Sequence, residues 1–166
     1  MDTAKMYLDF IGRFSTAVVI FSIIIGGVMW FRGIIPALWR LGKGLSNRKI
    51  AIFASSDHAG SLESLLLDSS LFHKKNITYI STVGDVGRAE NKTLFLLYWP
   101  DWGDHIEQVL PKKTDDTALI IYAPAEAERI SPEAMAKLNQ HRNVVVSNFR
   151  GRLLNDIVVS MITTSY

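Results

Sequence analysis

The sequence predicts an α/β protein in which a single N-terminal transmembrane helix precedes a five-stranded parallel sheet with helices on both faces. Two observations predict the helix: residues 14–31 carry no charge, and residues 32–49 carry only basic charges. A third predicts the sheet, because short apolar runs alternate with helix-like segments from residue 49 onward. Strands of a parallel sheet are covered on both faces, so they read as continuous apolar runs.

The uncharged stretch 14–31 is long enough to cross a bilayer. Lipid offers no partner to free peptide groups, so a lone segment there is helical. At 1.5 Å per residue it spans roughly 27 Å of a hydrocarbon core about 30 Å thick. The apolar pattern continues past Arg32 to Trp39, which extends the predicted transmembrane helix and its interfacial part over 14–39. A buried core helix and a cleaved signal peptide are the alternatives, and the length of the run favours a membrane anchor over both.

The charges flanking this helix predict its orientation. Residues 32–49 contain five basic residues and no acid, a net charge of +5, whereas residues 1–13 are balanced. Basic flanks stay on the cytoplasmic side. We therefore expect a single-pass protein of the cell's inner (plasma) membrane. Its predicted parts are a short non-cytoplasmic N-terminus (1–13), the transmembrane helix (14–39), a basic linker (40–48) and a cytoplasmic Rossmann-like domain (49–166).

The remaining composition excludes several classes of function. Residues 50–166 carry 11 basic and 14 acidic residues, a net charge of −3, so no polymeric nucleic acid is expected as a partner. The chain has no cysteine, which excludes disulfides, cysteine nucleophiles and thiolate metal sites. Its four histidines lie in separate segments without the spacing of metal ligands. We predict no metal site, no catalytic residue and no cofactor.

The expected elements of the domain follow one another as strand, helix, strand. Apolar, β-branched runs predict strands at 49–54, 77–81, 93–99, 118–122 and 144–147. Apolar positions at helix spacing predict helices at 60–68 with Ser61 as N-cap, from 104 to about 110, at 132–140 after the Ser131 cap, and at 153–163. Residues 84–88 are expected to form a loop. A domain of this length and alternation suits the flavodoxin or receiver-like strand order 2-1-3-4-5.

Candidate ligand-binding residues cluster after the strands. In open α/β sheets, ligands bind outside the carboxyl ends of the strands. Hydroxyls, exposed aromatic rings and arginines at one edge suit a nucleotide, because arginine binds phosphate and aromatic faces stack on bases. The predicted ligand-binding residues are Ser55, Ser56, Asp57, Trp99, Asp101, Trp102, Asn148, Arg150 and Arg152.

Each of these residues also has a purely structural interpretation. Ser55, Ser56 and Asp57 can cap a helix, and Trp102 can be a buried indole between two capping aspartates. Arg150 and Arg152 flank a glycine directly after a buried strand, which favours a ligand or an ion pair. There is no Walker sequence and no GxGxxG motif.

Small and polar residues on one face of the span predict contacts between helices. Ser15, Ser22 and Gly26 recur at seven- and four-residue spacing, and small residues let membrane helices approach closely. We expect a homo-oligomer or a subunit of a membrane complex.

Four segments at strand-like spacing, KIAIFASSD, TLFLLYWPDW, ALIIYAPAE and VVVSNFRGRLLND, follow the apolar span and its basic flank. Together they resemble, at the level of fold, the membrane-anchored Rossmann-like effectors of the CARF or TIR-like type in bacterial antiviral nucleotide signalling. The resemblance implies an oligomer whose cytoplasmic domain senses a nucleotide and alters its membrane helices. Two alternatives are a non-enzymatic docking subunit of a larger membrane complex and a membrane-tethered enzyme acting on a nucleotide or NAD.

Overall fold

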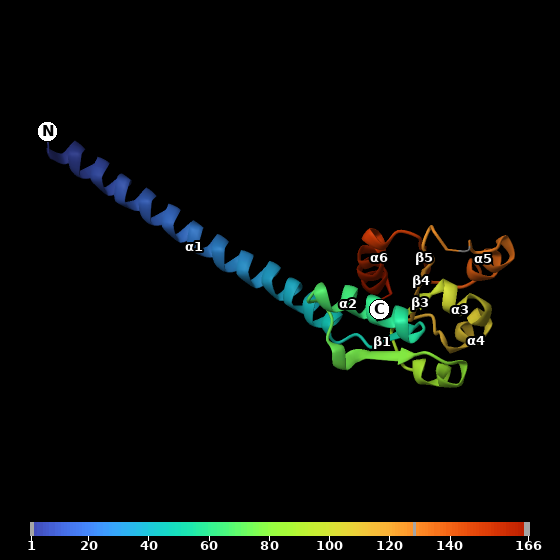
Figure 1. Cartoon of the computed structure of the whole chain (residues 1–166). Helices are drawn as coiled ribbons and strands as arrows, with labels where there is room; N and C mark the ends of the chain where they lie inside the picture. The colour runs from blue at the N-terminus through green and yellow to red at the C-terminus, as the bar shows by residue number, and fades with distance from the viewer. Residues whose placement is uncertain (1, 128, 165–166) are drawn as a thin grey trace. The chain divides into compact units, whose positions relative to one another are not determined.

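The computed structural model describes residues 2–127 and 129–164 and divides the chain into two compact units (Figure 1). The first unit is Met1–Gly42 and the second is Lys43–Tyr166. All strands and both core clusters belong to the second unit, so this unit has a hydrophobic core of its own.

The first unit is formed by one long helix, α1 (Asp2–Ser46), whose last four residues belong to the second unit. Its segment Phe10–Ile35 has 26 residues and a mean hydropathy of 2.2, and its residues are exposed. Within the described part of the chain it is the one helix long and apolar enough to cross a membrane. The apolar segment begins four residues before the predicted residue 14, and the stretch expected as a linker at 40–48 is helical as far as Ser46.

Polar side chains inside the apolar segment bond to their own helix. The Thr16 hydroxyl donates to the Gly12 carbonyl oxygen at 2.8 Å, and the Ser22 hydroxyl donates to Val18 at 2.8 Å. A hydroxyl satisfied in this way does not need water or a second helix as a partner. Ser15, Ser22 and Gly26, the residues predicted for helix packing, are all exposed on α1.

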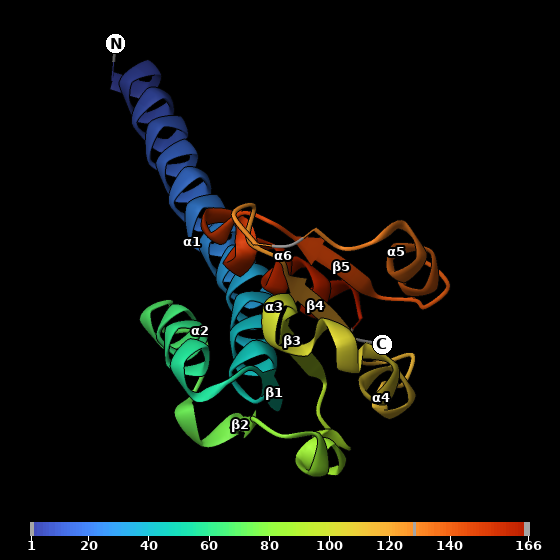
Figure 2. The same cartoon turned by 45° about the vertical axis from the view of Figure 1, so that its right-hand side comes forward.

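The second unit is built on a five-stranded, entirely parallel sheet (Figure 2). The strands are β1 (Ile50–Phe53), β2 (Ile77–Ile80), β3 (Leu94–Tyr98), β4 (Ala118–Tyr122) and β5 (Val144–Ser147). Their order is β2-β1-β3-β4-β5, which confirms the predicted fold class and the flavodoxin-like order.

Alternate residues of each strand point to opposite faces of the sheet, where they pack into two separate cores. On one face Ile50, Ile52, Leu94 and Leu96 pack with α2 (Ser56–Asp68) and α6 (Arg150–Thr163). On the other, Phe53 and Phe95 and their neighbours pack with α3 (Trp99–Trp102), α4 (Ile106–Val109) and α5 (Pro132–Leu138). Short 3-10 turns join the elements: η1 (Lys74–Asn76), η2 (Val83–Ala89), η3 (Gly103–His105) and η4 (Leu110–Lys112).

Two local predictions were wrong. The helix expected at residue 60 begins at Ser56, so Ser61 lies within α2 and is not its N-cap. The reason is that Ser55 already accepts the first helical bond, from the Ala59 amide at 2.9 Å. The segment 84–88, expected as a loop, forms part of the 3-10 helix η2 because Val86 and Ala89 are buried against the sheet.

The predicted cap of α5 is confirmed and supports a quantitative prediction. The Ser131 hydroxyl accepts a bond from the Ala134 amide at 3.1 Å, and Pro132 occupies the first turn. We expect Ser131→Ala to lower the free energy of unfolding by about 1 kcal/mol and Ser131→Gly by only a few tenths. Urea unfolding of the fragment 43–166 measures both, and equal losses would show that the cap bond contributes nothing.

Candidate functional site

The carboxyl ends of β1 and β3 form the topological switch point of the sheet. The chain after β1 enters α2 on one face, and the chain after β3 enters α3 on the other. Divergence of the two connections opens a crevice where ligands bind in folds of this order. Ser55 and Asp101 face each other across it, and the Ser55 amide donates to Asp101 Oδ2 at 2.7 Å.

His58, in the first turn of α2, joins the same cluster. Its Nδ1 atom lies 3.0 Å from Asp101 Oδ2 and 3.0 Å from the Ser55 hydroxyl oxygen. In a Ser-His-Asp triad, the carboxylate and the hydroxyl contact opposite ring nitrogens. Here both contact the same nitrogen, so the cluster holds the imidazole in place and is not arranged as a nucleophilic triad.

Electrostatic interactions keep one carboxyl group of the crevice, Asp101, ionised and one phenol, Tyr98, neutral. Burial opposes ionisation of Asp101, but the hydrogen bonds from Ser55 and His58 outweigh it and hold the pKa of Asp101 below its ordinary value. Burial raises the pKa of Tyr98, and the negative charges of Asp101 and Glu126 raise it further. Asp101 is therefore charged and Tyr98 is neutral at physiological pH.

Beside this crevice lies a pocket of about 240 Å³, which we call the switch-point pocket. Its walls come from α2, from the ends of β3 and β4, and from the start of α6. The lining residues are His58, Ser61, Leu62, Tyr98, Tyr122, Pro124, Glu126 and Arg150.

Aromatic rings make up one side of the switch-point pocket. Tyr98 and Tyr122 are the last residues of neighbouring strands and are paired in register, with ring centroids 5.8 Å apart. The imidazole of His58 lies against Tyr98 at a centroid distance of 4.3 Å and an interplanar angle of 35°. The rings are tilted with respect to one another, and aromatic surfaces of this kind accept a flat heterocycle.

The charged groups of the pocket are Arg150 and Glu126. Arg150 donates through Nη1 to the Ser61 hydroxyl oxygen at 2.9 Å and through Nη2 to the Ser61 carbonyl oxygen at 3.0 Å. These two bonds fix the guanidinium between α6 and α2 and leave three of its five N–H groups for an anion. Glu126 offers carboxylate oxygens, which accept bonds from hydroxyl groups such as those of a ribose.

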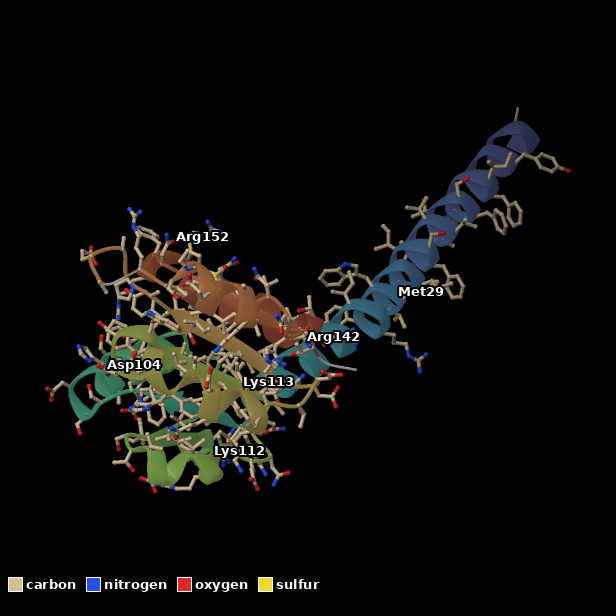
Figure 3. The ribbon with its side chains drawn as sticks, turned by 90° about the vertical axis from the view of Figure 1, so that its right-hand side faces the viewer. Met29, Asp104, Lys112, Lys113, Arg142 and Arg152 are labelled. Carbon is tan, nitrogen blue, oxygen red and sulfur yellow. The ribbon has the colours of Figure 1, made fainter. Side chains whose placement is uncertain are left out.

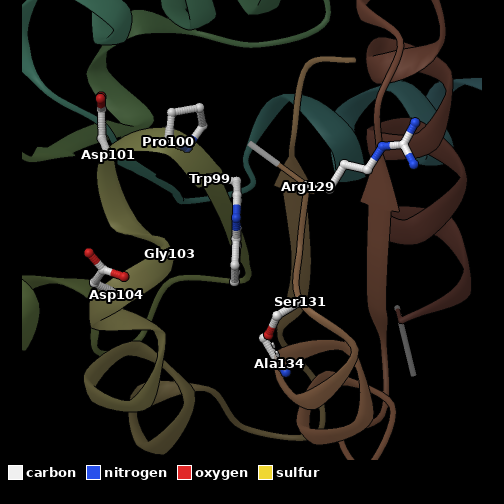
Figure 4. A pocket seen from close by; sticks show the side chains of 8 residues that line it. All are labelled: Trp99, Pro100, Asp101, Gly103, Asp104, Arg129, Ser131 and Ala134. Atoms are coloured by element: carbon white, nitrogen blue, oxygen red, sulfur yellow. Dashed lines mark hydrogen bonds between the residues drawn. The ribbon is translucent and has the colours of Figure 1, made fainter. Parts of the chain in front are cut away.

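Two other pockets adjoin the same edge of the sheet. One, of about 230 Å³, is lined by Trp99, Asp101, Asp104, Arg129 and Ser131 together with Pro100, Gly103 and Ala134 (Figure 4). The Trp99 ring lies so close to Gly103 that a Cβ there would come within 2.8 Å of it. The other, of about 330 Å³, is mostly apolar and includes Asn148.

The structure brings only part of the predicted site together. Ser55 and Asp101 meet in the crevice, and Arg150 lines the switch-point pocket. Trp99 and Asn148 line the other two pockets, while Ser56 and Asp57 lie exposed in the first turn of α2. Arg152 is exposed on α6 (Figure 3). Trp102 is only 2% exposed and packs edge-on against Phe53, so it belongs to the core and offers no face to a ligand.

Sequence reasoning missed the residues that shape the pocket. His58, Ser61, Tyr98, Tyr122 and Glu126 were not among the predicted binding residues. A signal for two of them was present, because Tyr98 and Tyr122 lie at the carboxyl ends of two predicted neighbouring strands, 93–99 and 118–122, and the ends of such strands meet at one edge. No family model, curated protein or solved structure matches this chain.

Proposed function

We propose that this protein is an oligomeric single-pass membrane effector whose cytoplasmic Rossmann-like domain binds a nucleotide-type ligand in the switch-point pocket. The observation that carries the proposal is the meeting of a fixed guanidinium, two tyrosine rings and a carboxylate in one pocket at the switch point of the sheet. A nucleotide presents a matching set of groups: an anionic phosphate, a flat base and a hydroxylated sugar.

The membrane side of the proposal rests on α1. The segment Phe10–Ile35 is long and apolar enough to anchor the chain, and the basic residues after it favour a cytoplasmic domain under the positive-inside rule. A single helix cannot line a pore, so an effect on the membrane requires several copies. Ligand binding changes the membrane helices only if the ligand has a higher affinity for one arrangement of the oligomer than for another.

The thermal midpoint of the fragment 43–166, measured against a panel of cyclic and linear nucleotides, tests the ligand. A ligand present at a hundredfold excess over its Kd stabilises the folded state by about 2.7 kcal/mol, which raises the midpoint of a domain of this size by roughly 8 °C. We expect one nucleotide class to produce this shift and Arg150→Ala to abolish it. Arg152→Ala is the matched control, because Arg152 is exposed outside the pocket, and it should keep the shift.

Three outcomes would redirect the interpretation. A shift that survives Arg150→Ala would place the ligand elsewhere. No shift with any nucleotide would contradict the sensor and favour the docking subunit, for which co-purification of the full chain from membranes is the next step. Chemical conversion of the nucleotide, followed by chromatography, would instead favour a membrane-tethered enzyme.

A further inference from the structure

The amino edge of the sheet, opposite the switch-point pocket, carries an excess of positive charge. This edge comprises the residues before each strand and the turns that lead into them. Backbone bonds connect its parts: Thr93 donates to the Lys49 carbonyl oxygen at 2.9 Å, and Leu119 donates to Asn143 at 2.9 Å. Cations at this edge that form no ion pair within the described residues are Arg48, Lys49, Lys75, Lys92, Lys113 and Arg142.

Acidic residues at the same edge do not balance these cations. Asp68, at the end of α2, and Asp115 and Asp116, in the turn before β4, are the acids there without an ion pair in the described structure. Glu90 is already paired with Lys112 at 2.7 Å. The edge therefore has six unpaired cations against three unpaired acids, although residues 50–166 carry a net charge of −3. The positive charge is concentrated at one end of a domain that is acidic overall.

Two of these cations lie close to each other. Lys113 and Arg142, both labelled in Figure 3, are close enough for the charge of Arg142 to act on Lys113. Burial lowers the pKa of Lys113, Asp115 opposes this, and the positive charge of Arg142 lowers it further. Adjacent like charges repel, and an external anion adds to the relief that Asp115 already gives.

Chain connectivity limits how far the start of β1 can lie from the end of the apolar segment. β1 begins at Ile50, and the apolar segment ends at Ile35. Between them α1 continues to Ser46, and eleven helical residues rise about 16 Å, less if the helix is tilted. Lipid headgroups occupy roughly 5–7 Å of that distance, which leaves about one Debye length of water at physiological salt.

We propose that the amino edge of the sheet docks on the anionic headgroups of the membrane that α1 spans, through Lys49, Lys92, Lys113 and Arg142. This inference rests on the membrane anchoring in the proposed function. Docking at the amino edge leaves the carboxyl edge, with its switch-point pocket, facing the aqueous phase. Each basic residue near an anionic surface shifts the docked-to-undocked ratio by about fivefold.

A distance measurement on the full chain in nanodiscs tests the docking. Because the chain has no cysteine, one introduced cysteine is labelled uniquely. Thr114→Cys places a donor dye at the exposed amino edge, and Ser81→Cys places it after the carboxyl end of β2. Energy transfer to an acceptor-labelled lipid is compared between phosphatidylcholine discs and discs with about 30 mol% phosphatidylserine. We expect transfer from position 114, but not from position 81, to rise with phosphatidylserine and to fall back at about 0.5 M salt.

Charge-removing variants identify the surface. Lys92→Gln, Lys113→Gln and Arg142→Gln together should lower the docked-to-undocked ratio by about a hundredfold, at about fivefold each. Arg129→Gln, Arg150→Gln and Arg152→Gln remove the same charge after the carboxyl ends of β4 and β5, and this control should dock like the unmodified chain while losing nucleotide binding. Circular dichroism verifies that both variants are folded.

The outcomes separate this inference from the proposed function. If the chain inserts and energy transfer from position 114 is the same in both lipids, the docking proposal is wrong. The same holds if the amino-edge variant leaves this transfer unchanged. Neither result would affect the proposed nucleotide site. Failure of the chain to insert would overturn the membrane anchor and the docking together. If the chain docks but no nucleotide shifts the thermal midpoint, the docking inference is supported and the proposed nucleotide sensing is contradicted.

Discussion

Trp102→Ala is expected to lower the free energy of unfolding of the domain by about 3–5 kcal/mol, the range for removing a large buried aromatic side chain. The indole is 2% exposed and packs edge-on against Phe53 at a centroid distance of 5.2 Å. Its removal leaves a cavity between α3 and the sheet, where neighbouring strand residues are fully buried and cannot relax into the space. Urea unfolding of the fragment 43–166 measures the loss.

Phe149→Ala is the matched control for this substitution. Phe149 is 64% exposed at the start of α6, so its truncation should change the free energy of unfolding by less than about 0.5 kcal/mol. A small loss for Trp102→Ala, similar to that of the control, would show that the indole is not part of the core. Trp102 would then return to the candidate ligand-binding residues.

Asp101→Asn is expected to remove part of the pH dependence of stability. The pKa of Asp101 is lower in the folded protein than in the unfolded chain. The resulting stabilisation is therefore fully present above the unfolded pKa, near 3.9, and is lost as the pH falls through the folded value. At neutral pH we expect Asp101→Asn to cost about 1–2 kcal/mol, because the Ser55 amide and His58 lose a charged partner. As the pH falls below about 3.9, the difference in the free energy of unfolding between the variant and the unmodified protein should shrink.

Denaturant unfolding of the fragment 43–166 between about pH 3 and pH 7 checks this expectation. Asp104→Asn is the control, because Asp104 lies in the same segment and forms no ion pair in the described structure. The free energy of unfolding of Asp104→Asn should follow that of the unmodified protein across the whole pH range. A constant difference between Asp101→Asn and the unmodified protein at every pH would mean that Asp101 stabilises the crevice by shape alone.

The Asp101 cluster also connects stability with the proposed function. Asp101 fixes the Ser55 amide and His58, and the His58 ring lies against Tyr98 in the switch-point pocket. Loss of the carboxylate therefore disturbs one wall of the pocket as well as the crevice. Nucleotide binding should weaken in Asp101→Asn, and the Asp104→Asn control should retain it.

The sequence by itself determined the apolar helix, the five strands and their order. Each of these features is local or follows from rules about connections. An uncharged run predicts a span, continuous apolar runs predict strands covered on both faces, and alternating helices require parallel pairing. Two strands, β4 at 118–122 and β5 at 144–147, have the bounds that the sequence predicted.

Only the tertiary structure decided which side chains of the carboxyl edge meet. Trp102 turned into the core and Tyr98 toward the pocket, although both were part of one aromatic segment in the sequence. Arg150 reached Ser61, 89 positions away, whereas Arg152 two residues later faced solvent. The physical reason is that a side chain's direction at the end of a strand depends on partners distant in the chain. Asp101 accepts the Ser55 amide bond 46 residues away and so fixes where α2 begins, which no local pattern encodes.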